Sequence, residues 1–399
     1  MLRQEGGPLE RLEVGNAVFW HGALVFSINS ASQPVAGCEP RGGMYACGAG
    51  LHGKGSASDR DSTWARRVGE GVNGVPMSIE RIDDDAATAL VLALLVLLGA
   101  LCCYLHVRKP RCVVVADDFG ISMERNRGII RALKSGVVTS TSVMANGDAA
   151  VEAIEMARAN GLLGVVGLHL NLTEGRPLSQ PQDIPSLLLQ RGETHQPGTG
   201  LKGGTLLRGK MGYRKACGSG EVKAAEAATE ARAQLAWFEK HVGCMPRFVD
   251  GHQHCHVVSV VREALAAVFA AAGVRVTRVP KERKPSRSLC PLCSIVDLEA
   301  EEARAVFEAH GVSSCEGFVG LSLCGVDYSA DDLLHAVRTQ MEHGARSCEV
   351  MVHPGEAHMK GTPWDDFSGS AARQHELDVL TSTGLRRRLR RLVRLQPHR

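Results

Sequence analysis

Residues 112–118 read Cys112-Val113-Val114-Val115-Ala116-Asp117-Asp118. An apolar, β-branched run that ends on polar side chains is typical of a buried strand of a parallel sheet, with chemistry at its C-terminal end. Two adjacent carboxylates repel each other and lose hydration on burial, and a metal ion would relieve both costs. We therefore predict that one carboxylate binds a cation while its neighbour stays free as a base. The alternative, a helix N-cap, accounts for only one of the two.

Downstream of this stretch, short β-branched runs alternate with longer helical stretches, which is the pattern of repeated βαβ units. The predicted strands are residues 112–116, 138–144, 165–170, 247–249, 274–279, 318–323 and 348–352. The predicted helices are residues 123–134, 149–159, 222–241, 260–272, 298–309 and 330–343. Because parallel strands close into a barrel more readily than they leave two open edges, the sequence predicts an α/β fold, a parallel (β/α) barrel of about seven strands.

Polar side chains stand at five of the predicted strand ends, where a parallel barrel places its active site. They are Asp117 and Asp118, His169, His252, Arg278 and His353. A lone histidine inside an apolar strand, such as His169, is more often a core residue, but the presence of Asp118 favours a ligand. Two long interruptions after strands, residues 176–221 and 281–296, are expected to build the substrate mouth.

Histidines supply the remaining candidate groups. His252, His254 and His256 alternate in the sequence and share one side if the strand continues, so spacing alone leaves open which of them binds a metal. A His-rich loop with no ligand role is the alternative. One of them with Asp118 and His169 would form an Asp-His-His face with positions open for water and substrate. His353 follows the last strand, and its imidazole is suited to act as a general acid that protonates a leaving amine. The alternative is a structural histidine that backbone hydrogen bonds hold in a loop.

The N-terminal part of the chain has a different character. Residues 1–85 are rich in Gly, Ser and charge without a sustained period, so we predict that they are disordered. Residues 86–106 are apolar over about the thickness of a bilayer core and form a candidate transmembrane helix. Acidic residues precede this segment and basic residues follow it, which predicts a cytoplasmic catalytic domain anchored by a single N-terminal helix. The alternatives are a buried helix, or residues that are absent from the mature protein.

Composition excludes some classes of partner. The 46 basic and 43 acidic residues are scattered and give a net charge of only +3, and aromatic residues make up 4% of the chain. Neither a broad positive field nor a base-stacking platform is available, so we expect no nucleic-acid partner. The 13 cysteines are spread over a large α/β chain, which favours reduced thiols over a disulfide framework. The oligomeric state is left open.

Five motifs occur together in one order. They are Ala116-Asp117-Asp118-Phe119-Gly120, Gly136 to Ser142, Gly167-Leu168-His169 with Asn171 to Leu178, Asp250 to His256, and Glu349 to Gly355. At these motifs the sequence resembles the YdjC-like carbohydrate deacetylase family, which is related to bacterial chitooligosaccharide deacetylases, and it is most similar to the animal-type members. The resemblance assigns residues 111–399 to one deacetylase domain.

The resemblance implies a distorted (β/α) barrel that hydrolyses the N-acetyl group of N-acetylglucosamine-type carbohydrates and releases acetate. It implies a divalent cation, for which Mg²⁺ is the first candidate and Zn²⁺ the second. By matching position, Asp117 would be the general base, and Asp118, His169 and His252 the metal ligands. Arg278 would face the substrate. The resemblance thus favours His252 over the other two histidines of its motif.

Two other functions use the same features. Another metal-assisted hydrolase, such as a phosphoesterase, could use the same ligands, although no Gly-rich phosphate cradle accompanies the strand ends. A non-catalytic sugar-binding or membrane-tethered barrel is the second alternative. Retention of the whole polar set favours an enzyme, because a binding module has no chemical need for it.

Overall fold

The computed structural model describes residues 12–14, 17–20, 23–26, 89, 91–101, 109–190, 205–325, 327–357 and 367–398. The chain divides into two units, Met1–Arg81 and Ile82–Arg399. In the first unit, strands β1 (Leu12–Val14), β2 (Ala17–Trp20) and β3 (Ala23–Phe26) pair in an antiparallel sheet. Disorder was predicted over all of residues 1–85, and these three short strands lie within that range; the rest of the range lies outside the described residues.

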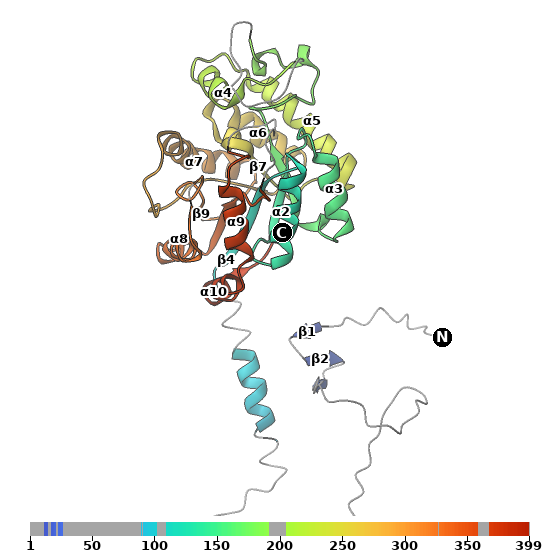
Figure 1. The fold of residues 1–399 in the computed structure, drawn as a ribbon, viewed down its shortest axis with the longest axis vertical. Helices are drawn as coiled ribbons and strands as arrows, with labels where there is room; N and C mark the ends of the chain where they lie inside the picture. The colour runs from blue at the N-terminus through green and yellow to red at the C-terminus, as the bar shows by residue number, and fades with distance from the viewer. Residues whose placement is uncertain are drawn as a thin grey trace, which may run out of the picture. The chain divides into compact units, whose positions relative to one another are not determined.

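A curled, all-parallel sheet forms the centre of the second unit (Figure 1). Its strands are β4 (Arg111–Phe119), β5 (Ser140–Val143), β6 (Val166–Leu170), β7 (Phe248–Gly251), β8 (Val276–Thr277), β9 (Gly317–Val319) and β10 (Ser347–Val352). They run in the order β8-β7-β6-β5-β4-β10-β9, and the two-residue β11 (Arg394–Leu395) pairs with β4. A single parallel bridge joins Val276 of β8 to Ser313, ahead of β9, so the curl stops short of a regular closed ladder.

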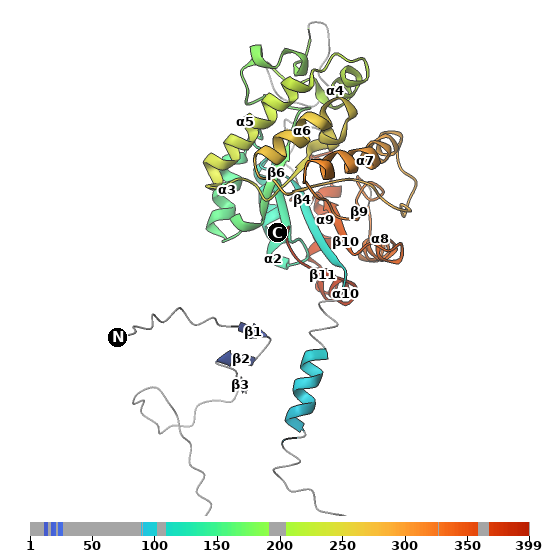
Figure 2. The same cartoon turned by 180° about the vertical axis from the view of Figure 1, so that it is seen from behind.

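Helices follow most strands and pack around the outside of the curl (Figure 2). They are α2 (Met123–Ser135), α3 (Ala150–Ala159), α4 (Gly209–Gly218), α5 (Ala224–Val242), α6 (Ser259–Ala271), α7 (Pro291–Ala309), α8 (Ala330–Glu342), α9 (Ala372–Thr381) and α10 (Leu385–Leu392). Short 3₁₀ turns are η1 (Leu163–Val165), η2 (Pro181–Asp183), η3 (Pro185–Leu187) and η4 (His252–Val257).

Local sequence signals set the limits of these helices. The Ser122 side chain accepts a hydrogen bond from the Arg125 amide and begins α2, and Gly136 ends it with a φ of 74°. A capping box between Ser329 and Asp332 begins α8.

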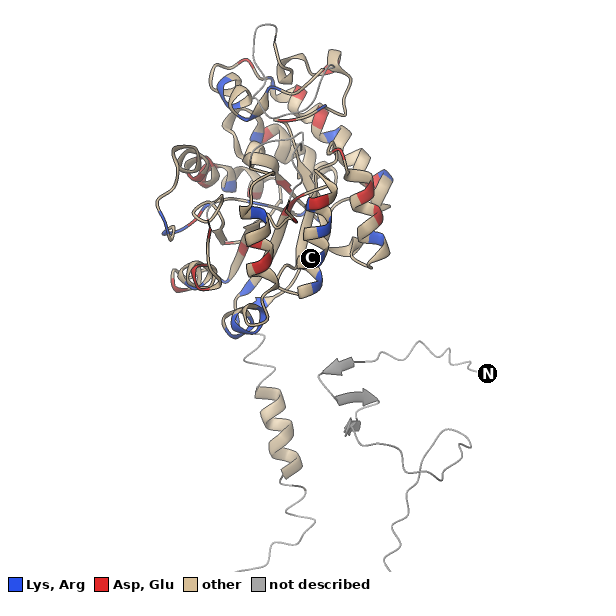
Figure 3. Cartoon of the chain, in the orientation of Figure 1, with Lys and Arg blue, Asp and Glu red and all other residues tan. Residues whose placement is uncertain are grey.

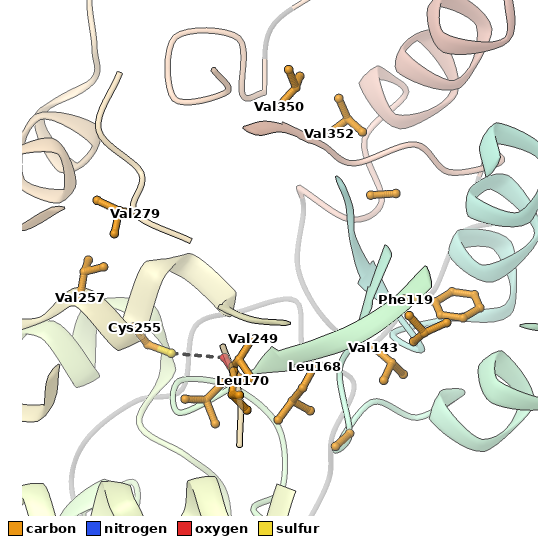
Figure 4. Packing of buried hydrophobic residues seen from close by; sticks show 14 of the residues in the cluster. Phe119, Val143, Leu168, Leu170, Val249, Cys255, Val257, Val279, Val350 and Val352 are labelled. Atoms are coloured by element: carbon orange, nitrogen blue, oxygen red, sulfur yellow. Dashed lines mark hydrogen bonds between the residues drawn. The ribbon is translucent and has the colours of Figure 1, made fainter. Parts of the chain in front are cut away.

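Strand alternation divides the core into two layers. On β4, Val114 and Ala116 belong to the large cluster between the sheet and the helices, whereas Val113 and Val115 contact Phe248 in a second cluster. Figure 4 shows the large cluster near β6, where Leu168 and Leu170 pack and the Cys255 thiol donates to the Leu170 carbonyl at 3.3 Å. Residues of odd number on β4 and β6 therefore face away from the helices, and Asp117 and His169 continue those rows.

The predicted architecture is confirmed, with corrections of detail. All seven predicted strands are present, in a distorted barrel of parallel strands with outer helices. The interruption predicted over 281–296 is shorter, because α7 begins at Pro291, where proline is favourable in a first helical turn. The interruption at 176–221 contains α4 and two 3₁₀ turns. The short β11 was not predicted, since two residues carry no periodicity.

The candidate transmembrane segment at 86–106 lies only partly within the described residues. Residues 91–101 are helical and exposed. Within the part of the chain that the structure describes, no helix is long and apolar enough to cross a membrane.

Candidate active site

Asp117 and Asp118 lie at the C-terminal end of β4, and each is 2% exposed. Regular alternation would turn these neighbours to opposite faces of the sheet. Between Ala116 and Phe119, however, the register with β5 shifts, and Asp118 adopts a φ of +64°. A left-handed conformation costs a non-glycine residue about 1–3 kcal/mol and is typical of functional sites. This local distortion lets both carboxylates take part in one cluster of polar groups.

Asp118 meets two imidazoles from neighbouring elements. Its Oδ1 lies 3.3 Å from His169 Nε2 and 3.1 Å from His252 Nδ1, and those two nitrogens are 3.3 Å apart. His169 comes from β6 and His252 begins η4 directly after β7. All three side chains are buried. Three candidate ligand atoms therefore surround one point.

The outer nitrogen of each imidazole bonds to a further carboxylate. His169 Nδ1 lies 2.7 Å from Asp250 Oδ1, and His252 Nε2 lies 3.1 Å from Glu174 Oε2. Asp250 is the register partner of His169 on β7, so the sheet itself places that pair side by side. Outer carboxylates of this kind fix the tautomer and direct the inner nitrogen of a histidine toward a metal ion.

The residues present fit a divalent cation. Asp118, His169 and His252 offer one carboxylate oxygen and two imidazole nitrogens, all within 4.8 Å of one another. For ligands about 2.0–2.3 Å from a metal, neighbouring ligand atoms are expected to be about 3.0–3.4 Å apart, which matches the observed separations. Because both four- and six-coordinate arrangements give that range, the geometry does not select Mg²⁺ or Zn²⁺.

The electrostatics of the cluster also favour a cation. Burial works to raise the pKa of Asp118, yet hydrogen bonds from His169 and His252 hold it well below its usual range. Burial works to lower the pKa of His169, but Asp250 and Asp117 raise it to about 10. For His252, hydrogen bonds to Asp118 and Glu174 overcome burial and raise the pKa to about 9. A site that binds protons this strongly attracts positive charge, and a metal ion would compete for the same atoms.

Asp117 is held by a different partner. Arg278, which directly follows β8 and is 1% exposed, donates two hydrogen bonds to it, with Nη2 2.7 Å from Oδ1. Arg278 Nη2 also lies 2.9 Å from Asp250 Oδ2, and its Nε donates to Glu349 Oε1 at 2.6 Å. The guanidinium is therefore fully engaged with three carboxylates. Burial raises the pKa of Asp117 to about 6, although Arg278 opposes the shift.

His353 directly follows β10 and is 8% exposed. Its Nε2 lies 3.9 Å from Asp117 Oδ2, and its ring packs edge-on against Phe367. Its carbonyl accepts from Arg125 at 2.9 Å. Burial lowers the pKa of His353 well below its ordinary value; Asp118 opposes this shift, whereas Arg373 and Arg125 add to it.

The remaining histidines of the 252–256 motif do not join this cluster. The strand ends at Gly251, and Gln253 and His254 have positive φ, so the expectation that the three histidines share one side is wrong. His254 packs edge-on against Phe318, and His256 Nε2 lies 2.7 Å from the Arg278 carbonyl. Of the three, only His252 contacts Asp118.

The structure thus gathers Asp117, Asp118, His169, His252, Arg278 and His353 at the C-terminal ends of the strands. Sequence reasoning missed the supporting carboxylates of Asp250, Glu174 and Glu349. All three stand within motifs that were identified, but spacing along a chain does not indicate which imidazole or guanidinium a carboxylate will meet.

Comparison with known proteins places this chain in a family context. The family model for YdjC-like protein matches residues 111–391. The chain is 38% identical over 297 residues to a protein of Mus musculus named carbohydrate deacetylase. This alignment covers 70% of the present chain and 90% of the mouse protein. The chain is 31% identical over 274 residues to a chitooligosaccharide deacetylase of Serratia marcescens, with 69% and 92% covered.

A solved structure shares the fold. It is a putative cellobiose-phosphate cleavage protein from Enterococcus faecalis, similar at a TM-score of 0.56 and 20% identity, which covers 73% of this chain and 97% of that one. At this level of identity the likeness supports the architecture of the sheet and helices alone.

Proposed function

Because the chain belongs to the YdjC-like protein family, we propose that it is a metal-dependent hydrolase that removes N-acetyl groups from N-acetylglucosamine-type carbohydrates. The acetamide C–N bond breaks, and the products are acetate and a free amino sugar. The proposed cation is Mg²⁺, with Zn²⁺ as the alternative.

One observation carries this proposal, namely the division of labour between two adjacent carboxylates. Asp118 faces two imidazoles whose outer nitrogens bond to carboxylates, as metal ligands do. Asp117 lies beside this trio but is held by Arg278. A metal-assisted hydrolase needs such a pair, one group for the cation and one for the proton of the attacking water.

The proposed mechanism uses the chain's own side chains in sequence. A cation held by Asp118, His169 and His252 would polarise the acetamide carbonyl and acidify the attacking water. Asp117 takes the proton of that water, and Arg278 keeps its carboxylate aimed through two hydrogen bonds. His353, 3.9 Å from Asp117, is placed to protonate the departing amine. To act as the acid, His353 must first carry a proton; its Nε2 lies 3.9 Å from Asp117 Oδ2, which is longer than a hydrogen bond, so transfer from Asp117 requires the two groups to approach more closely.

Arg278 fits a positioning role. Its three bonding nitrogens are directed at Asp117, Asp250 and Glu349. The family resemblance predicts that Arg278 contacts the substrate, and this stays a prediction. Its hydrogen bonds to Asp117, the proposed base, already suit a role in orienting that carboxylate, and this role requires no change in the position of Arg278.

The charge of the site weighs against a phosphoesterase. Asp117, Asp118, Asp250 and Glu174 lie around the proposed metal position, and Arg278 is occupied by carboxylates. A phosphate dianion would meet this negative cluster without a free arginine to receive it, whereas an acetamide is neutral. The non-catalytic barrel remains the alternative that an assay must decide.

An acetate-release assay on the purified chain tests the proposal. The substrates are N-acetylglucosamine and its short β-1,4 oligomers, with metal removed by chelation and then restored as Mg²⁺ or Zn²⁺. We expect acetate from at least one oligomer, loss after chelation and recovery with one metal. Sugar binding without acetate would support the binding module instead, and phosphate release from sugar phosphates would support the phosphoesterase.

A further inference from the structure

Helix α10 presents a dense row of positive charge on the surface of the larger unit. Its sequence is Leu-Arg-Arg-Arg-Leu-Arg-Arg-Leu, and Leu385 and Leu389 are buried at 1% and 0% exposure. The exposed arginines are Arg386, Arg387, Arg388, Arg390 and Arg391. Figure 3 shows the resulting concentration of blue at α10. The two leucines fix the helix to the domain, and their burial directs the arginines outward.

Most of this charge has no acidic partner. Arg388 pairs with Asp331 of α8. Among the residues that the structure describes, no carboxylate forms an ion pair with Arg387, Arg390 or Arg391. Arg390 and Arg391 lie in the last turn of α10, where positive charge is favourable to the helix dipole, but like charges in one row repel each other, so an external anion would be a favourable complement.

Further basic residues lie at the same end of the sheet. The Lys109 side chain donates to the Arg390 carbonyl at 2.7 Å, and the exposed Arg111 begins β4. The exposed Arg346 precedes β10, and its carbonyl accepts from the Arg111 amide. These residues mark the N-terminal ends of the parallel strands. Asp117 lies six residues further along β4, about 20 Å away at the rise of a strand, so the basic end and the proposed active site are at opposite ends of the sheet.

An apolar helix precedes this basic end in the sequence. Residues 91–101 are helical, and their large side chains are 50–64% exposed, among them Leu94 (50%) and Leu97 (64%). Leu101 precedes Lys109 by eight residues, which span at most about 29 Å when fully extended. The length of chain therefore limits how far Leu101 can be from Lys109, whose side chain contacts the Arg390 carbonyl of α10.

We propose that the arginine face of α10 docks on an anionic lipid bilayer, with the apolar helix at 91–101 as the second contact. Arginine side chains bind lipid phosphates and carboxylates, and one weak signal alone gives only marginal membrane binding, so paired basic and apolar elements suit this surface. A nucleic acid would use the arginines but offers nothing to the exposed leucines. With α10 on the bilayer, the strand ends that carry Asp117 face away from the lipid, toward water-soluble substrates.

Vesicle co-sedimentation of the full chain tests the proposal. The probes are vesicles of phosphatidylcholine alone and vesicles with roughly a third of phosphatidylserine. We expect binding to the anionic vesicles, little to the neutral ones, and release as NaCl rises from 50 mM to 500 mM. The double variant R387E/R391E should bind the anionic vesicles at least tenfold more weakly, and L94D/L97D should also lose binding.

The matched control is R232E/K240E, which makes the same change of net charge on exposed positions of α5. It should bind like the parent chain, and acetate release should be unchanged in R387E/R391E because α10 is remote from the proposed site. Equal binding to neutral vesicles, salt-insensitive binding, or equal loss in the control would overturn the proposal. Tighter binding to a duplex oligonucleotide than to the anionic vesicles would assign the face to nucleic acid instead. Since no step involves acetate release, these results are independent of the proposed deacetylase activity.

Discussion

Two aspartates with the same side chain and adjacent positions are given different chemistry by their neighbours. Asp117 accepts two hydrogen bonds from Arg278, whereas Asp118 meets the inner nitrogens of His169 and His252. The difference depends on one left-handed residue, since a regular strand would have turned Asp118 to the helix side of the sheet. The same Asp-to-Asn substitution at each position should therefore have different effects on metal binding and on activity.

Replacing Asp117 with Asn keeps shape and hydrogen bonding but removes the proton acceptor. We expect metal to bind as before while acetate release falls on the order of a hundredfold or more. Replacing Asp118 with Asn removes a charge from the proposed metal shell, so metal affinity should fall and activity should return only partly at high metal concentration. Metal titration by calorimetry and the acetate assay measure the two effects. Equal loss of metal affinity in both variants would refute this division of roles.

Glu174 offers a test of the outer carboxylates. Its Oε2 lies 3.1 Å from His252 Nε2, so Glu174→Gln removes the charge that holds this imidazole. We expect metal affinity to fall roughly ten- to a hundredfold, with the fold intact by circular dichroism.

The matched control for this change is Glu263→Gln. The Glu263 carboxylate lies 3.4 Å from His310 Nε2 on the surface, outside the proposed site, and its loss should leave metal affinity unchanged. Unaltered affinity in Glu174→Gln would show that His252 needs no such support.

At the scale of elements, η4 decides which histidine can reach the metal position. Strand β7 ends at Gly251, and the His256 ring occupies the space beside its Cα. A Cβ at residue 251 would lie 2.2 Å from His256 Nδ1. His256 is fully buried and its Nε2 lies against the Arg278 carbonyl, so it has little room to move. The absence of a side chain at residue 251 therefore lets η4 fold back directly after His252.

Gly251→Ala should destabilise the protein by about 1–3 kcal/mol through this overlap, and displacement of His252 should weaken metal binding as well. Gly164→Ala is the control, because a Cβ there meets no atom within 4 Å, and its effect should stay within about 0.5 kcal/mol. Chemical denaturation measures both. Equal stability of the two variants would show that the His256 ring can move away from the added Cβ with little loss in the free energy of unfolding.

At the scale of the whole molecule, the proposed metal position joins segments far apart in the sequence. Asp118, His169 and His252 come from the ends of β4, β6 and β7; β6 and β7 pair directly, and β5 separates β6 from β4. A cation bound there would link these segments in the folded state only, and it would stabilise that state by mass action.

Chelation should therefore lower the melting temperature of the protein. At a metal concentration about a hundred times Kd, binding contributes about 2.7 kcal/mol, which corresponds to roughly 4–5 °C for a domain of this size. Differential scanning calorimetry with and without chelator measures the shift. The Asp118→Asn variant should show a much smaller shift, and a shift of the same size in both proteins would place the metal elsewhere.

The sequence by itself determined the order of strands and helices, because each depends on local periodicity. The β-branched runs and the helical stretches located all seven strands of the curled sheet, and the polar residues at strand ends pointed to Asp117, Asp118, His169 and His353. Strand ends could be read in this way because parallel strands all deliver their C-terminal ends to one edge.

Tertiary structure alone decided which polar groups meet. His252 rather than His254 or His256 faces Asp118 because the strand ends at Gly251, and η4 turns the later histidines away. Arg278 bonds to Asp117, Asp250 and Glu349 because the sheet curls until β8 and β10 approach across its interior. Hydrogen bonds and ion pairs act over a few ångströms of space, and partners that lie 28 to 161 residues apart in the chain leave no local pattern from which their contact could be read.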